Sequence, residues 1–114
     1  MKQLLLIVVA AAGLFGADLN GKWNFTWQTP GGERSSTLTF TQKAEQVSAL
    51  FPEGKDPITG TYKDGKLSLA GRVYSAEAGE AAEFHLDATV SDVEMKGTGG
   101  WGEHQITFTA RKAD

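Results

Sequence analysis

Residues 22–29 read KWNFTWQT, a stretch in which polar and apolar residues alternate strictly. Trp23, Phe25 and Trp27 fall on one side of the alternation, and the polar residues around them fall on the other. A β-strand is the regular element that turns successive side chains to opposite faces, so this period of two predicts a strand with one buried and one exposed face. The flanking sequence should therefore supply its partner strands.

The same alternation returns along the rest of the chain, separated by turn residues. The predicted strands are residues 22–29, 36–43, 46–51, 58–63, 67–74 and 83–91, a seventh that begins at Val93, and 103–112. Asp64-Gly65 is the strongest hairpin signal, because both residue types tolerate the positive φ angles of a two-residue turn. Nearly all connections are short, so strands adjacent in sequence should pair. We predict an all-β fold, a single eight-stranded antiparallel up-and-down β-barrel.

The first 17 residues have a different pattern. Lys2 precedes an uncharged run over residues 4–15, and the small residues Gly16 and Ala17 follow it. This order predicts a secretory signal peptide over residues 1–17 and a barrel domain over residues 18–114, exported to the periplasm or the extracellular space. The run is shorter than the roughly 20 residues of a membrane-spanning helix. An uncleaved anchor and a cut after Ala12 remain the alternatives.

Composition narrows the possible partners. The chain has no cysteine and a net charge of −3, which becomes −4 when Lys2 leaves with the leader. A domain of this size without disulfides has to be stabilised by a packed core and a closed sheet. An acidic chain without a Lys/Arg cluster argues against a nucleic-acid partner. We also expect no stable membrane insertion after the leader is removed.

The opening GKWNFTWQTPGG and the closing GTGGWGEHQITFTARK resemble small bacterial exported domains of the lipocalin-like, or calycin, type. Gly21-Lys22-Trp23 resembles the G-x-W that opens the first lipocalin strand, and Arg111 resembles the Arg that covers this Trp. The resemblance implies a cation–π contact between Arg111 and Trp23 that seals one end of the barrel. It also implies binding of a small apolar molecule. Arg111 has the parity of the outward Thr107 and Thr109, so the last strand twists at its end or the pair does not form.

The inward positions are almost entirely apolar, which allows two interpretations of the barrel interior. One is a filled, dry core; the other is a pocket at the open end for a neutral apolar ligand. No Arg or Lys is expected inward, so a fatty-acid carboxylate would lack a partner. The expected ligand-binding residues are Trp27, Phe51, Tyr62 and Trp101, with Trp27 and Trp101 at opposite ends. A cavity above about 300 Å³ would favour the pocket.

Catalytic motifs are lacking, so we expect no enzyme and no cofactor. Glu83, His85 and Asp87 share one strand face, but they would bind a metal only if a neighbouring strand completed the site. The alternative to a ligand-binding module is a protein-interaction module, such as an inhibitor of a secreted hydrolase. Its contact segments would be residues 18–20, 52–57 and 75–82. An uncharged outer surface of Thr, Asn and Gln could instead contact polysaccharide or a second barrel.

Overall fold

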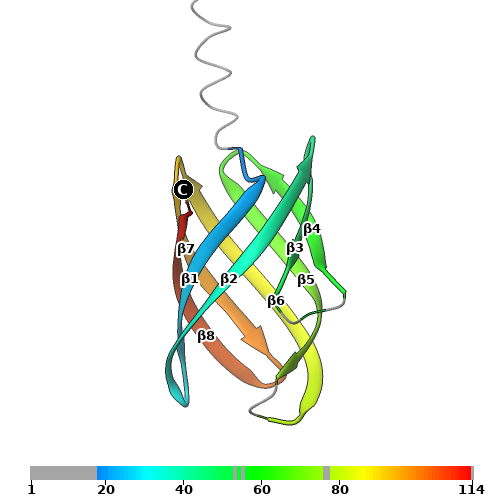
Figure 1. The fold of residues 1–114 in the computed structure, drawn as a ribbon, viewed down its shortest axis with the longest axis vertical. Helices are drawn as coiled ribbons and strands as arrows, with labels where there is room; N and C mark the ends of the chain where they lie inside the picture. Colours follow the sequence, from blue (N-terminus) through cyan, green and yellow to red (C-terminus); the bar gives the residue numbers. More distant parts are fainter. Residues whose placement is uncertain (1–17, 53, 55, 76–77, 114) are drawn as a thin grey trace, which may run out of the picture.

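The computed structural model describes residues 18–52, 54, 56–75 and 78–113. They form a closed antiparallel β-barrel in which each strand pairs with its neighbours in sequence and β1 pairs with β8 (Figure 1). The strands are β1 (Gly21–Thr29), β2 (Gly32–Lys43), β3 (Gln46–Leu50), β4 (Ile58–Lys63), β5 (Lys66–Ser75), β6 (Glu80–Ser91), β7 (Glu94–Trp101) and β8 (His104–Lys112). The predicted fold is confirmed. The predicted leader, residues 1–17, lies outside the described residues.

Nothing in the described part of the chain forms a helix of the length and apolarity needed to cross a membrane.

Several strand boundaries differ from the prediction. β2 begins at Gly32, four residues before Ser36, because its backbone stays paired with β1 as far as the turn. β6 likewise begins at Glu80 rather than at residue 83, since it stays paired with β5. Val93, predicted to begin the seventh strand, lies in the turn before β7 and is 39% exposed. In each case backbone pairing and turn geometry set the strand end, and side-chain alternation does not report them.

The tight turns show why particular residues connect the strands. Asp64 and Gly65 have φ angles of 54° and 80°, the positive values that a two-residue type I′ hairpin requires. Ala44, in the connection between β2 and β3, has a φ of 56°, which is unfavourable for a residue with a Cβ atom. Turn geometry is therefore imposed on Ala44 by the strands on either side.

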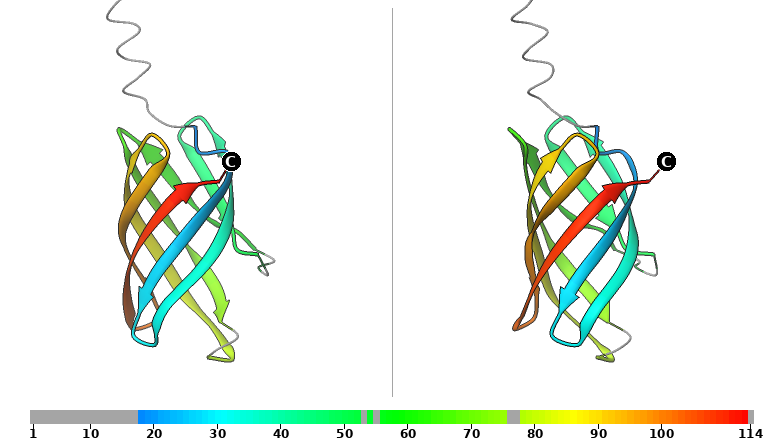
Figure 2. Two further views of the ribbon diagram at one scale, coloured as in Figure 1. Left: turned by 60° about the vertical axis from the view of Figure 1, so that its left-hand side comes forward. Right: turned by 90° about the vertical axis from the view of Figure 1, so that its left-hand side faces the viewer.

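The up-and-down topology gives the barrel two different ends. The β1–β2, β5–β6 and β7–β8 connections lie at one end, here called the mouth (Figure 1). The other three hairpin turns lie at the opposite, closed end. The first described residues and the C-terminal end also lie at the closed end, as Figure 2 shows from two further sides. The mouth is therefore formed by turns and by no chain terminus of the described residues.

Two glycines allow neighbouring strands to approach closely. A Cβ atom on Gly60 would lie 1.8 Å from the Ser68 carbonyl oxygen, and one on Gly97 would lie 1.9 Å from the Asp87 carbonyl oxygen. No side chain fits at such distances. Glycine at these positions permits the local bending that a small barrel needs to close.

Aromatic side chains fill the interior from the closed end toward the mouth. Ring centroids of consecutive neighbours lie 4.9–6.1 Å apart, the range in which aromatic pairs attract. We call these seven rings the aromatic column: Trp23, Phe40, Phe25, Phe108, Trp27, Phe51 and Phe84. Aliphatic residues such as Leu38, Leu67 and Leu86 pack around it. No charged residue in the described segments is buried.

Residues 18–20 cover Trp23 at the closed end of the barrel. Leu19 is fully buried, and its carbonyl oxygen accepts a hydrogen bond of 3.1 Å from Trp23 Nε1. The Leu19 backbone amide donates to Gln42 Oε1 at 2.9 Å, and the Gln42 backbone amide donates to Asn20 Oδ1 at 2.8 Å. The segment is thus fixed by its neighbours, and we call it the N-terminal plug.

Candidate functional site

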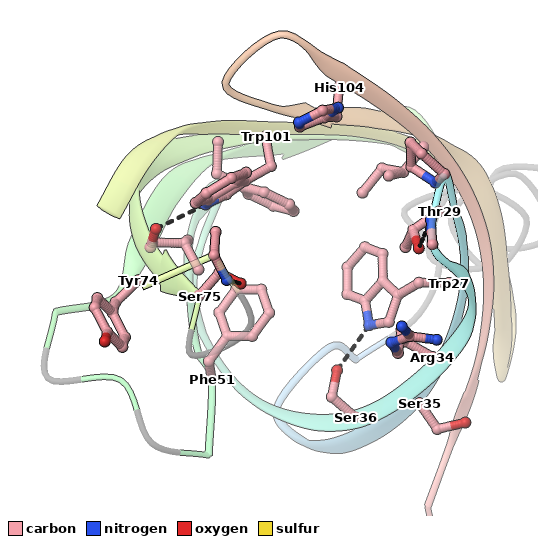
Figure 3. A pocket seen from close by; sticks show the side chains of 16 residues that line it. Trp27, Thr29, Arg34, Ser35, Ser36, Phe51, Tyr74, Ser75, Trp101 and His104 are labelled. Carbon is pink, nitrogen blue, oxygen red and sulfur yellow. Dashed lines mark hydrogen bonds between the residues drawn. The ribbon is translucent and has the colours of Figure 1, made fainter. Parts of the chain in front are cut away.

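A cavity of about 590 Å³ opens at the mouth of the barrel (Figure 3). It is lined by residues from several strands and from the turns that join them. These are Trp27, Thr29, Pro30, Gly31, Arg34, Ser35, Ser36, Phe51, Val73, Tyr74, Ser75, Ala78, Phe84, Trp101, His104 and Ile106. The volume lies within the range of about 300–1,000 Å³ typical of small-molecule sites. The two interpretations of the interior therefore apply to different levels: the core is filled toward the closed end and hollow at the mouth.

The rings of the aromatic column nearest the mouth, Trp27, Phe51 and Phe84, line the cavity. The Trp27 centroid lies 6.1 Å from that of Phe51 and 5.9 Å from that of Phe84. Trp27 Nε1 donates a hydrogen bond of 2.7 Å to Ser36 Oγ, and Trp101 Nε1 donates one of 2.7 Å to the Val73 carbonyl oxygen. Both indoles therefore meet the cavity with their N–H groups already bonded, and what they offer a ligand is apolar ring surface.

The cavity continues through the side of the barrel. β3 covers β2 only as far as Thr39, and β4 covers β5 only as far as Ala70. The parts of β2 and β5 nearest the mouth consequently lack these strand partners. A second cavity of about 810 Å³ lies between them. Both cavities are lined by Ser36, Phe51, Val73 and Tyr74. The hollow thus has an axial opening and a lateral one, with Phe51 between them.

Three of the four expected ligand-binding residues, Trp27, Phe51 and Trp101, come together at the mouth cavity. The fourth, Tyr62, is outside it. Tyr62 is buried next to the β4–β5 turn, and its backbone amide donates to the Glu45 carbonyl oxygen at 2.8 Å, which fixes it near the closed end. Its inward parity was correctly predicted, but its height in the barrel was wrong.

The expectation that Trp27 and Trp101 lie at opposite ends was also wrong. In an up-and-down barrel the first and seventh connections fall at the same end, because six strands, an even number, separate them. Trp27 precedes the first connection and Trp101 precedes the seventh. Both therefore line the same cavity, as Figure 3 shows.

Arg34 is a mouth residue that the sequence analysis missed. It lies directly across from Trp27 in the β1–β2 register, so it shares the inner face with that ring. The expectation that no inward cation exists failed because the second strand was predicted to begin only at Ser36. A period of two counted back from Leu38 and Ser36 reaches Arg34 and could have identified it.

The proposed pair of Trp23 and Arg111 does not form. Arg111 points outward, as its parity indicated, and makes an ion pair with Glu94. Lys112, one residue later and across from Trp23 in the register, places its Nζ 5.9 Å from the Trp23 ring centroid. Lys112 Nζ also donates a hydrogen bond to the Asp18 carbonyl oxygen. The closed end is thus covered by a cation, but the cation is a lysine.

The N-terminal plug changes the interpretation of another predicted contact segment. Residues 18–20 were candidates for a free inhibitory N-terminus, yet they close the base of the barrel. Hydrogen bonds from the side chain and backbone of Asn20 hold the pKa of the Asp18 carboxyl below its usual value, and Lys112 adds to the effect. The segment is part of the fold and is not available as an extended arm.

The outer faces of the strands carry the remaining candidate groups. Glu83, His85 and Asp87 are exposed on β6, and no three ligand-type side chains in the described segments are grouped so that they could hold a metal. The Thr-rich surface is present as predicted, with Thr37 Oγ1 donating to Asn24 Oδ1 at 2.8 Å. Such cross-strand bonds are ordinary stabilisation of an exposed sheet face.

Comparison of this chain with family models, with curated proteins and with solved structures finds no match. The barrel architecture is compatible with a lipocalin-like fold.

Proposed function

We propose that this protein is a binding module for a small, largely apolar molecule, of the lipocalin-like type that its sequence resembles. The observation that carries the proposal is the cavity of about 590 Å³ at the mouth, next to a filled core that occupies the rest of the barrel. A ligand in the cavity would cover the rings of the aromatic column nearest the mouth. Burial of apolar surface stabilises a complex by about 25 cal/mol per Å². A ligand would thus gain free energy from surface that the barrel leaves open.

The test is a titration with N-phenyl-1-naphthylamine, a neutral apolar probe whose fluorescence rises in apolar surroundings. We expect a saturable increase, a higher melting temperature and altered emission from both mouth tryptophans. The melting temperature should rise because a ligand that binds only the folded state stabilises it. Absence of any saturable signal from the folded protein would remove the proposal.

A matched pair of variants locates the site. Ala78→Leu adds volume at the mouth, whereas Ala70→Leu adds the same volume on the exposed face of β5. The first should weaken probe binding by several-fold, and the second should leave it unchanged. Equal effects would place the probe elsewhere on the barrel.

A second candidate is a protein-interaction module, such as an inhibitor of a secreted hydrolase. It is favoured by the edges of β2 and β5 nearest the mouth. These edges lack β3 and β4 as partners and could pair with an extended segment of another protein. Ser35→Pro would remove one backbone donor from the β2 edge, while Ser68→Pro would do so within a fully flanked strand. If an inhibited hydrolase is found, Ser35→Pro in folded protein should weaken inhibition; unchanged inhibition would exclude this edge.

A further inference from the structure

The side of the barrel near the mouth has a gap between β2 and β5. Residues 32–38 of β2 pair with β1, and residues 71–75 of β5 pair with β6. Nearer the closed end, β3 and β4 occupy the two strand positions between β2 and β5, and Figure 1 shows both strands ending before the mouth. The cavity of about 810 Å³ lies in this gap, which we call the slot.

Backbone groups of β2 and β5 point into the slot. Residues on either side of a two-residue hairpin turn form a hydrogen-bonded pair, here Lys43 with Gln46 and Lys63 with Lys66. Every second residue counted from Lys43 along β2 and from Lys66 along β5 therefore turns its backbone N–H and C=O toward the β3–β4 side. Among the described residues, no strand pairs with these groups beyond Thr39 and Ala70. We call the residues that carry them the edge residues: Glu33, Ser35, Thr37, Arg72 and Tyr74.

Apolar side chains are exposed beside the slot. Tyr74 on β5 is 65% exposed, and Leu50 at the end of β3 is 37% exposed. They are two of the three large apolar side chains exposed in the described part of the chain, and the third, Val93, lies in a turn at the closed end. An exposed tyrosine next to unpaired backbone groups is typical of a surface that contacts another protein.

The charged side chains among the edge residues already have partners on the barrel. Glu33 Oε1 accepts a hydrogen bond of 3.1 Å from Gln28 Nε2. Arg72 Nη1 donates one of 3.3 Å to Glu83 Oε2. What the two edges leave to be satisfied is therefore the backbone, which favours an uncharged partner segment over a charged one.

We infer that the slot receives a β-hairpin of a partner protein, with one arm paired to β2 and the other to β5. This names the partner element of the second candidate function and does not depend on the small-molecule site. A single extended strand would pair with one edge and leave the other unpaired. Two strands fill the same two positions that β3 and β4 fill nearer the closed end.

The slot also specifies the composition of the hairpin. Residues 71–75 limit the arm beside β5 to about five residues, because an arm pairs with its neighbour residue by residue. Inward side chains of the arms would meet Phe51 and Val73, so they should be apolar. A hairpin of this size that pairs with both edges and packs on Tyr74 would bury on the order of 1,000 Å² in total, the area that a specific complex needs.

The experiment uses three synthetic, backbone-cyclised hairpins with two five-residue arms joined by D-Pro-Gly turns. Their outward positions are Thr, and their inward positions are Val, Ile or Phe. Affinity is measured by calorimetric titration, and the site is located by hydrogen exchange of the backbone amides of the protein. We expect saturable binding with slower exchange at the edge residues. If none of the three hairpins binds, or if exchange slows elsewhere on the barrel, the inference is wrong.

Modified hairpins test whether both edges are used. N-methylation of the outward-pointing backbone amides of one arm removes its hydrogen bonds to the protein and leaves those between the arms intact. Methylation of either arm should weaken binding by about tenfold, because two or more backbone hydrogen bonds are lost. If methylation of one arm has no effect, only a single strand docks and the hairpin assignment fails.

A matched pair of variants tests the position of the hairpin. Tyr74→Ala should weaken hairpin binding by several-fold, whereas Val93→Ala, at an exposed apolar residue of the closed end, should leave it unchanged. Equal effects of the two variants would contradict docking at the slot. N-phenyl-1-naphthylamine reports the small-molecule site in the same protein. Binding of this probe without binding of any hairpin would overturn the present inference alone, and the reverse result would overturn the proposed function alone.

Discussion

Phe40 packs between Trp23 and Phe25 in the aromatic column, with centroid distances of 6.1 and 6.0 Å, and is 2% exposed. We predict that Phe40→Ala lowers the free energy of unfolding by about 3–5 kcal/mol, through lost burial and the cavity left behind. Thr39→Ala, one residue earlier on the outer face, should cost less than about 1 kcal/mol. Urea denaturation measures both, and similar losses for the two variants would contradict the assigned faces.

Ala44 is a residue whose backbone conformation suits glycine better. We predict that Ala44→Gly raises the free energy of unfolding by up to about 1 kcal/mol, because relief at a φ of 56° exceeds the entropy cost of a glycine. Ala70→Gly, in the regular part of β5, should instead lower it by about 0.5–1 kcal/mol. A loss of stability in both variants would show that the turn is not strained.

Residue identity alone indicated which side chains face inward but not how high they lie in the barrel. Tyr62 and Phe51 have the same inward parity, yet one lies near the closed end and the other lines the mouth. Height depends on the register between strands and on the strand shear, which no single strand encodes. This explains why three expected site residues meet and the fourth does not.

At the scale of the strand, β7 shows how a barrel tolerates close contact. A Cβ atom on Gly97 would collide with backbone atoms of β6, whereas one on Gly100 would meet mainly the His85 ring, which can turn aside. We predict that Gly97→Ala lowers the free energy of unfolding by more than about 2 kcal/mol, and that Gly100→Ala costs clearly less. Thermal unfolding compares the two, and an equal cost would argue against the close approach of β6 and β7.

The N-terminal plug is a second element whose contribution can be measured. Leu19 is fully buried and Leu50 is 37% exposed, so the same Leu→Ala change tests burial at the two sites. Leu19→Ala should lower the free energy of unfolding by about 2–5 kcal/mol, and Leu50→Ala by less than about 1 kcal/mol. A small effect at Leu19 would mean that the plug detaches without consequence for the barrel.

Elements were predicted well where alternation and turn chemistry agree. β4 begins and ends where the sequence analysis placed it, because Asp64-Gly65 fixes the turn that follows. The early part of β2, with the sequence GERS, shows no apolar alternation, since its inward residues line an open mouth. The segment that a core-based pattern could not detect is therefore the one that carries Arg34.

For the whole molecule, the order of charged, apolar and small residues over residues 1–17 leads us to propose export with removal of this segment. Intact-mass measurement of protein recovered from the cell envelope should show a chain that begins at Asp18. A soluble exported protein that retains its full mass would exclude cleavage. A mass corresponding to a cut after Ala12 would move the start by five residues and leave the N-terminal plug complete.

Lys112 and the N-terminal plug bring both ends of the described barrel to the side opposite the mouth. A fluorophore, an affinity tag or a tether to a solid support can therefore be attached at either end without crowding the cavity. Protein immobilised through its C-terminus would present the cavity to the flowing solution. The same geometry suits a fusion partner, which would extend from the base and leave the rim accessible.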